Sequence, residues 1–230
     1  MIREGSVEEF SDGRFYTAQD MVRIGNNDCA GCSDCGRMGA VIVLDPLDVF
    51  ELNRFLSETF AGLLGETVEL KVIDGLIMPV LKMIPADDRA AEGTVCPYLS
   101  EEGRCSIHAF RPGICRLYPL GRYWEGGDFR YILQRGECTH PGSTKVKIRK
   151  WLGIPDLARY EDFCRSWHAL LEQVRSFLAG EDPDGQLRRR MCVTLLKEFY
   201  EKPWADADFY TEYGLREKEV RRQLGFASAG

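Results

Sequence analysis

The chain is organised around Cys29-Ala30-Gly31-Cys32-Ser33-Asp34-Cys35, which is a Cys-x-x-Cys-x-x-Cys run. A helix or strand would send the three thiols to different faces, so we expect a loop folded around a bound centre, with backbone N–H groups donating to the sulfurs. In ferredoxin-type runs a fourth cysteine follows three residues later, but here that position is Met38. The run therefore predicts a metal centre whose remaining ligands come from elsewhere in the chain.

Length, composition and charge are those of an ordinary globular protein. The 230 residues are 44% hydrophobic and 29% charged, enough for a real core. The net charge of −6 argues against a protein that binds nucleic acid by neutralising phosphates. Residues 1–10 contain charges and no apolar run, and no uncharged stretch has transmembrane length. We therefore expect a cytoplasmic protein that has neither a nucleic acid nor a membrane as a partner.

Hydrophobic patterns predict strands and one helix in the first two thirds of the chain. A β-branched run at 39–44 predicts a buried strand, and Asp45-Pro46 has the form of a helix start before an apolar pattern at 47–64. Segments 67–73 and 76–84, joined by Asp74-Gly75, are expected to form a hairpin. Segment 96–119 is dense in Cys, Pro and Gly and predicts loop with short turns, and 129–134 predicts another strand.

The last third has the three- and four-residue apolar spacing of amphipathic helices at 157–179 and 186–200. A short element at 206–213 and a charged helix at 215–224 are expected to follow. The predicted fold is α+β: an irregular Cys-rich metal-binding core with a few short strands, with C-terminal amphipathic helices packed on it. We expect a cysteine-cluster domain at 1–152 and a helical extension at 153–230.

A second group of cysteines lies in loop-forming sequence. It comprises Cys96-Pro-Tyr-Leu, Cys105-Ser-Ile-His108, Arg111-Pro-Gly-Ile-Cys115-Arg116-Leu-Tyr-Pro, and Cys138-Thr-His140-Pro-Gly. With the first run, this order resembles the YkgJ-type cysteine-cluster proteins, which are described as zinc- or iron-chelating domains and share their motif set with flagellin lysine N-methylases. The resemblance covers about residues 29–142 and does not extend beyond about Leu152.

The resemblance implies a set of seven metal ligands, namely Cys29, Cys32, Cys35, Cys96, Cys105, Cys115 and Cys138. Two positions depart from the family pattern. Gly36 stands where a cysteine doublet commonly closes the first run, which removes an eighth thiol. His108 stands where the family often has tyrosine, and its imidazole could serve as a substitute ligand.

Seven thiolates are more than one zinc ion or one 4Fe–4S cluster requires, since each takes four ligands. One interpretation is a single cluster, with the remaining cysteines structural or redox-active. The other is two centres, the second completed by His108, His140 or a non-protein ligand. The ferredoxin-like spacing of the first run favours an iron–sulfur cluster, because few of the thiols come in the pairs that zinc modules use. Zinc remains the alternative.

Other candidates have simpler explanations. Cys164 and Cys192 lie in the amphipathic helices, where small core residues are expected, and His168 is expected at a helix surface or boundary. Arg111 and Arg116 could offset thiolate charge or hold an anionic cofactor, and ordinary salt bridges would explain them equally well.

Three functions fit these features. The first is an iron–sulfur protein that transfers electrons to an unknown protein or redox partner, or whose cluster shapes a small site. The second, implied by the resemblance, is a protein lysine N-methylase-like enzyme that uses S-adenosylmethionine. A free coordination position of the metal, or a pocket beside Arg111 and Arg116, would hold the carboxylate of this cofactor. The third is a structural zinc module with a helical partner surface. No Gly-rich strand-turn-helix motif of ordinary methyltransferases is present.

Overall fold

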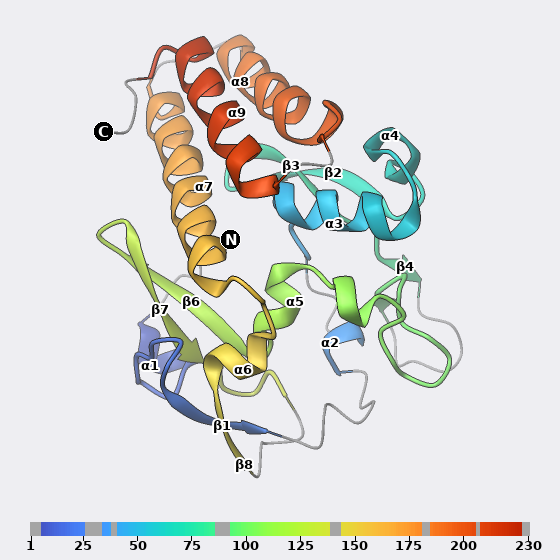
Figure 1. Ribbon diagram of the computed structural model, residues 1–230, viewed down its shortest axis with the longest axis vertical. Helices are drawn as coiled ribbons and strands as arrows, with labels where there is room; N and C mark the ends of the chain where they lie inside the picture. The colour runs from blue at the N-terminus through green and yellow to red at the C-terminus, as the bar shows by residue number, and fades with distance from the viewer. Residues whose placement is uncertain are drawn as a thin grey trace. The chain divides into compact units, whose positions relative to one another are not determined.

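The fold is mixed α+β, as the sequence predicts, with short two-stranded antiparallel sheets and C-terminal helices (Figure 1). The computed structural model describes residues 6–25, 34–37, 41–85, 93–138, 144–180, 185–205 and 208–226. Within these ranges, no helix combines the length and the apolar character that a bilayer crossing needs.

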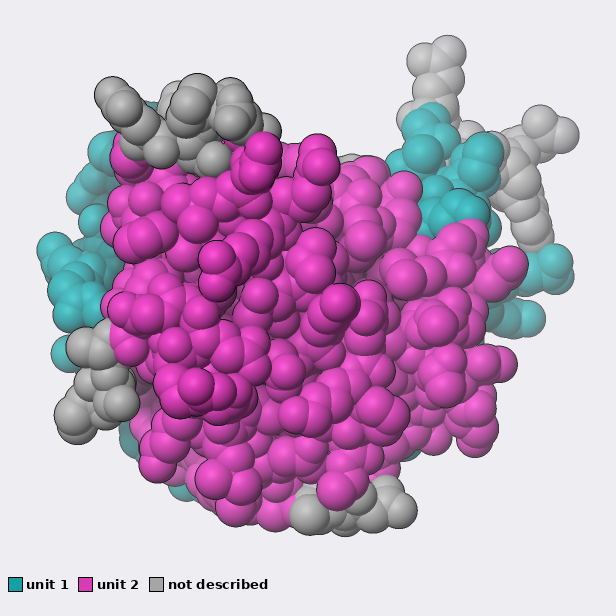
Figure 2. All heavy atoms as spheres, turned by 90° about the horizontal axis from the view of Figure 1, so that it is seen from above, with its two compact units in different colours: residues 1–43, 81–157 teal, residues 44–80, 158–230 magenta. Residues whose placement is uncertain are grey.

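The chain divides into two compact units, each built from two separate stretches of sequence (Figure 2). Unit 1 comprises residues 1–43 and 81–157, and unit 2 comprises residues 44–80 and 158–230. Segment 44–80 therefore belongs to the same unit as the C-terminal helices. Compactness does not test independent folding, so the predicted domains, 1–152 and 153–230, remain a prediction.

Unit 1 contains short elements separated by loops. Its sheets pair β1 with β8, β4 with β5, and β6 with β7, each antiparallel. Its elements are α1 (Val7–Phe10), β1 (Met21–Gly25), α2 (Asp34–Arg37), β4 (Ile84–Pro85), β5 (Thr94–Val95), the 3-10 helix η1 (His108–Phe110), α5 (Gly113–Leu117), β6 (Leu120–Glu125), β7 (Asp128–Leu133), β8 (Thr144–Lys147) and α6 (Ile148–Leu152).

The β6–β7 hairpin forms because two adjacent glycines allow its turn. Gly126 and Gly127 have φ of 59° and 83°, which a two-residue turn between twisted strands requires. β7 confirms the strand predicted at 129–134, and its Tyr131 is buried and exchanges backbone hydrogen bonds of 2.8 and 2.9 Å with Tyr16. The loop character predicted for 96–119 is confirmed, with η1 and α5 as its short turns.

Unit 2 begins with a helix whose start is specified by its sequence. In α3 (Pro46–Leu56), the Asp45 carboxylate accepts a hydrogen bond from the Asp48 N–H at 2.9 Å, and the Asp48 carboxylate accepts one from the Asp45 N–H at 3.0 Å. This reciprocal capping, with proline at the first helical position, satisfies donors that have no partner within a helix.

The single helix predicted at 47–64 is wrong, because the structure breaks it at Ser57. This residue has φ 55° and ψ 38°, a left-handed conformation that ends α3 at Leu56. Thr59 then caps a separate helix, α4 (Phe60–Leu63), by accepting a hydrogen bond from the Gly62 N–H at 3.1 Å. The apolar spacing continued through the break because both helices bury residues in the same unit.

The predicted hairpin is confirmed as β2 (Val68–Ile73) and β3 (Leu76–Leu81), joined by Asp74 and Gly75 with φ of 47° and 80°. The strand predicted at 39–44 is not regular over its described part, 41–44. There, the Leu44 N–H donates to the Pro79 carbonyl at 2.9 Å. Residues 39 and 40 lie outside the described ranges.

The C-terminal helices of unit 2 are α7 (Leu157–Leu178), α8 (Gln186–Leu196) and α9 (Phe209–Gln223), with a π-helical turn, η2 (Lys197–Glu201), directly after α8. The helix predicted at 157–179 is confirmed. The helix predicted at 186–200 changes at Lys197 to the wider π geometry. The two elements predicted at 206–213 and 215–224 are one helix, since Gly214 lies within α9.

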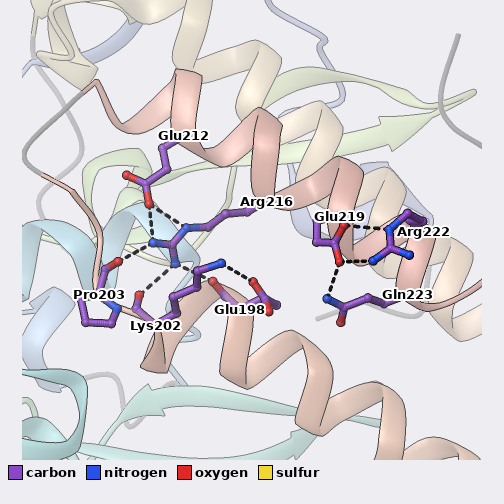
Figure 3. A network of polar contacts seen from close by, with 8 residues as sticks. All are labelled: Glu198, Lys202, Pro203, Glu212, Arg216, Glu219, Arg222 and Gln223. Carbon is purple, nitrogen blue, oxygen red and sulfur yellow. Dashed lines mark hydrogen bonds and ion pairs between the residues drawn. The ribbon is translucent and has the colours of Figure 1, made fainter.

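Aromatic rings and one buried arginine hold this helical part together. Ring centroids of Phe163 and Tyr213 lie 4.8 Å apart, and those of Trp167 and Phe199 lie 5.0 Å apart. Arg216 is only 4% exposed and satisfies carbonyls at the end of η2 (Figure 3). Its guanidinium bonds to the carboxylate of Glu212 and to the backbone carbonyls of Glu198, Lys202 and Pro203.

Candidate metal centre

The described end of the first cysteine run is bonded to the start of the second cysteine group. α2 carries Cys35, which is exposed, and Gly36, whose carbonyl accepts a hydrogen bond from the Cys96 N–H at 2.8 Å. A Cβ on Gly36 would lie 3.0 Å from Cδ1 of Leu99, so the glycine permits this close approach. Cys29 and Cys32 lie outside the described residues, and their role as ligands remains a prediction.

The loop that follows reverses direction and brings Cys96 and Cys105 together. Leu99 forms an isolated antiparallel bridge with Cys105, and the Ser106 N–H donates to the Tyr98 carbonyl at 2.8 Å. The Leu99 N–H also donates to the Cys96 carbonyl at 3.0 Å. These backbone bonds place two free, half-buried thiols at the two ends of one closed loop.

The environments of these two thiols are alike. Burial raises the pKa of Cys96 and the adjacent Cys105 raises it further, whereas a hydrogen bond from the Tyr98 backbone opposes the shift. Burial also raises the pKa of Cys105, opposed by a hydrogen bond from the Ile107 backbone and by the positive charge of Arg111. In both cases the bond comes from the second residue after the cysteine. Two adjacent, partly desolvated sulfurs with backbone donors suit a bound metal, which would favour their thiolate forms.

Arg111 connects this thiol pair to a histidine. A hydrogen bond joins Arg111 Nη1 to Nε2 of His108. Burial lowers the pKa of His108, and the positive charges of Arg111 and Arg116 lower it further, so the ring is neutral at pH 7. The role of His108 as a substitute ligand remains a prediction. The second arginine, Arg116, donates to the Ala109 carbonyl at 2.5 Å.

The remaining predicted ligands in the described part of the chain are Cys115, in α5, and Cys138, which follows β7; both are half-buried. Among the described side chains, no three of His, Cys, Asp or Glu are grouped so as to hold a metal ion. Cys29 and Cys32, two of the three cysteines of the first run, lie outside the described residues. The seven-cysteine ligand set, and the cofactor-binding role of Arg111 and Arg116, therefore remain predictions, and His140 also lies outside the described residues.

The two cysteines assigned to the helical core are confirmed there. Cys164 in α7 is 6% exposed, and Cys192 in α8 is fully buried, with its sulfur accepting a hydrogen bond from the Ile77 N–H at 3.3 Å. Both belong to unit 2, whereas all seven predicted ligands belong to unit 1. His168, on α7, is half-buried, with a pKa lowered mainly by burial.

Sequence reasoning missed the backbone donors of Tyr98 and Ile107 and the close packing of Gly36. Backbone N–H donors were expected for the sulfurs of the first run, where they remain a prediction, and the donors to Cys96 and Cys105 could not be named without the loop conformation. The Cys96-Pro97 dipeptide was the available signal, because proline restricts the residue before it to extended backbone.

A comparison with known protein families identifies the same cysteine-rich segment as a metal-binding candidate. Residues 28–139 match the model of the family CxxCxxCC, described as "Putative zinc- or iron-chelating domain". The searches of curated proteins and of solved structures each return no match to this chain. The matched segment contains all seven predicted ligand cysteines and ends directly after the last of them. Residues 28–139 of this chain are thus similar to the CxxCxxCC family, whose model is described as a zinc- or iron-chelating domain.

Proposed function

We propose that the cysteine-rich segment binds a 4Fe–4S cluster, and that the protein serves in electron transfer or in building a small site around that cluster. The hydrogen bond between the Gly36 carbonyl and the Cys96 N–H carries this proposal. It joins Gly36, which directly follows the first run with its ferredoxin-like spacing, to a further cysteine of unit 1. In the simplest arrangement, Cys29, Cys32 and Cys35 supply three ligands and Cys96 supplies the fourth.

The neighbouring residues suit a negatively charged cluster. The Tyr98 and Ile107 backbones donate to the sulfurs, and hydrogen bonds of this kind stabilise thiolate ligands and tune cluster potentials. Arg111 adds positive charge beside Cys105. When bound, the cluster would supply one-electron chemistry, and these residues would orient its ligands and offset its charge.

Anaerobic purification followed by metal analysis tests the proposal. We expect a brown protein with broad visible absorption and about four iron and about four sulfide per chain. A colourless protein that holds zinc after anaerobic preparation would overturn the proposal and would leave a structural zinc module.

A calorimetric titration of the iron-loaded protein with S-adenosylmethionine then separates the electron-transfer function from the methylase-like function. Electron transfer predicts no binding, whereas binding would favour the methylase-like alternative.

A further inference from the structure

Strand β2 has an outer edge that carries both apolar and charged side chains. Among the described residues, β2 forms a two-stranded sheet with β3, and its first residue, Val68, also forms an isolated parallel bridge with Leu64. In a two-residue hairpin the residues flanking the turn bond to each other, so the backbone groups of Ile73 face β3. Alternation then turns the backbone groups of Val72, Leu70 and Val68 away from β3. The Val68 carbonyl fits this assignment, since it accepts a hydrogen bond from the Gly65 N–H at 2.8 Å.

The side chains along this edge are unusually exposed for apolar residues in a strand. Leu70 is 42% exposed and Val72 is 70% exposed. On the opposite face of β2, Lys71 Nζ lies 2.8 Å from Glu69 Oε1, with the two side chains 45% and 35% exposed. An exposed strand edge with apolar side chains is a template for pairing with another strand.

The charges on β2 are arranged to complement a second copy of the same strand. In an antiparallel pair centred on Leu70, each Leu70 lies opposite Leu70 of the partner subunit, and their outward N–H and C=O groups bond in pairs. The same register places Glu69 opposite Lys71 of the partner subunit, and symmetry repeats this ion pair on the other side. Opposite charges directly across an antiparallel pair are stabilising.

We propose that β2 is a self-association surface, through which two copies of this chain pair antiparallel about a two-fold axis at Leu70. A two-fold interface must be self-complementary, and Glu69-Leu70-Lys71 meets this condition because reversal of the strand exchanges the two charges. The surface lies in unit 2 and does not depend on whether the cysteine segment binds iron.

Sedimentation velocity from about 1 μM to about 1 mM protein tests this surface. We expect a reversible monomer–dimer equilibrium. Lys71→Glu sets like charges across the strands and should weaken the dimer about tenfold or more. The double variant Glu69→Lys/Lys71→Glu restores complementary pairs and should restore the dimer. Circular dichroism checks that each variant is folded.

Lys218→Glu, which makes the same change in net charge at an exposed position of α9, is the matched control and should leave association unchanged. A protein that stays monomeric over the whole range would overturn the proposal. So would a dimer that is indifferent to Lys71→Glu, or one that the double variant does not restore.

Discussion

The N–H of Cys96 donates a hydrogen bond to the carbonyl of Gly36 at 2.8 Å, and this bond joins two cysteine groups that are far apart in the sequence. Gly36 occupies the position where the family pattern commonly has another cysteine. The absence of a side chain there permits the contact with Leu99. The position that lacks the family's additional cysteine thus has a packing role in this chain.

Gly36→Val should loosen this junction. The added side chain would begin 3.0 Å from Cδ1 of Leu99, and overpacking of this kind costs about 1–3 kcal/mol. We expect faster loss of the bound metal to a chelator, with partial rescue by Leu99→Ala in the same chain. Gly214→Ala, at a position where a Cβ meets nothing within 4 Å, is the control and should retain metal normally. Unchanged metal loss in Gly36→Val would contradict the packing role.

Cys96→Ser should lower the metal content of the purified protein, because it removes the thiol that we place beside the first run. Cys192→Ala should retain the metal and lower the free energy of unfolding by about 1 kcal/mol, since Cys192 is a fully buried residue of the other unit. Elemental analysis and chemical denaturation measure the two effects. Equal metal loss in both variants would show that the division between ligand and core cysteines is wrong.

Arg111→Gln should weaken metal retention about tenfold, because Arg111 stabilises the charged form of the Cys105 thiol and substitutions of groups that support metal ligands have effects of this size. Competition with a chromophoric chelator measures it. Arg104→Gln removes an exposed arginine from the same loop and should change retention little. If the two variants behaved alike, the effect of Arg111 would be one of net charge only.

Arg216→Met should destabilise the protein by about 3 kcal/mol or more, since it leaves Glu212 and several backbone carbonyls without their buried donor. Arg222→Met should cost less than about 1 kcal/mol, because that arginine is 74% exposed in its pair with Glu219 (Figure 3). Urea denaturation of both variants provides the comparison. Similar costs would refute a special role for the buried guanidinium.

Asp208 should make stability depend on pH in the acid range. Hydrogen bonds from Arg159 and Thr211 lower the pKa of Asp208 to about 2. An aspartate in the unfolded chain titrates at about 3.9, so the contribution is complete above that pH and is lost as the pH falls toward about 2. Asp208→Asn should remove this part of the pH dependence in denaturation curves between about pH 5 and pH 2. If the dependence of stability on pH were unaltered in Asp208→Asn, this role of Asp208 would be wrong.

Local patterns in the sequence predicted much of the secondary structure. The Asp45-Pro46 start of α3, the Asp74-Gly75 turn and the apolar spacing of α7 all depend on neighbours a few residues away, and all three are confirmed. The break at Ser57 was missed, because a left-handed serine between two apolar patterns has no distinctive local signal. The π-helical turn at 197–201 was also missed. Arg216, which bonds to a backbone carbonyl of this turn, comes from another helix, so the contact leaves no local signal in the sequence.

The sequence by itself predicted the chemistry: the number and spacing of the cysteines favour a zinc or iron centre in this segment. Only the tertiary structure decided that the Gly36 carbonyl bonds to the Cys96 N–H and that the Tyr98 and Ile107 backbones donate hydrogen bonds to the sulfurs. It also decided that residues 44–80 belong to the same unit as the C-terminal helices. The type of metal that a side chain can bind is a property of that side chain and can therefore be inferred from the sequence. Contacts between distant segments depend on how all the buried surfaces of a unit pack at once, and no local pattern records that.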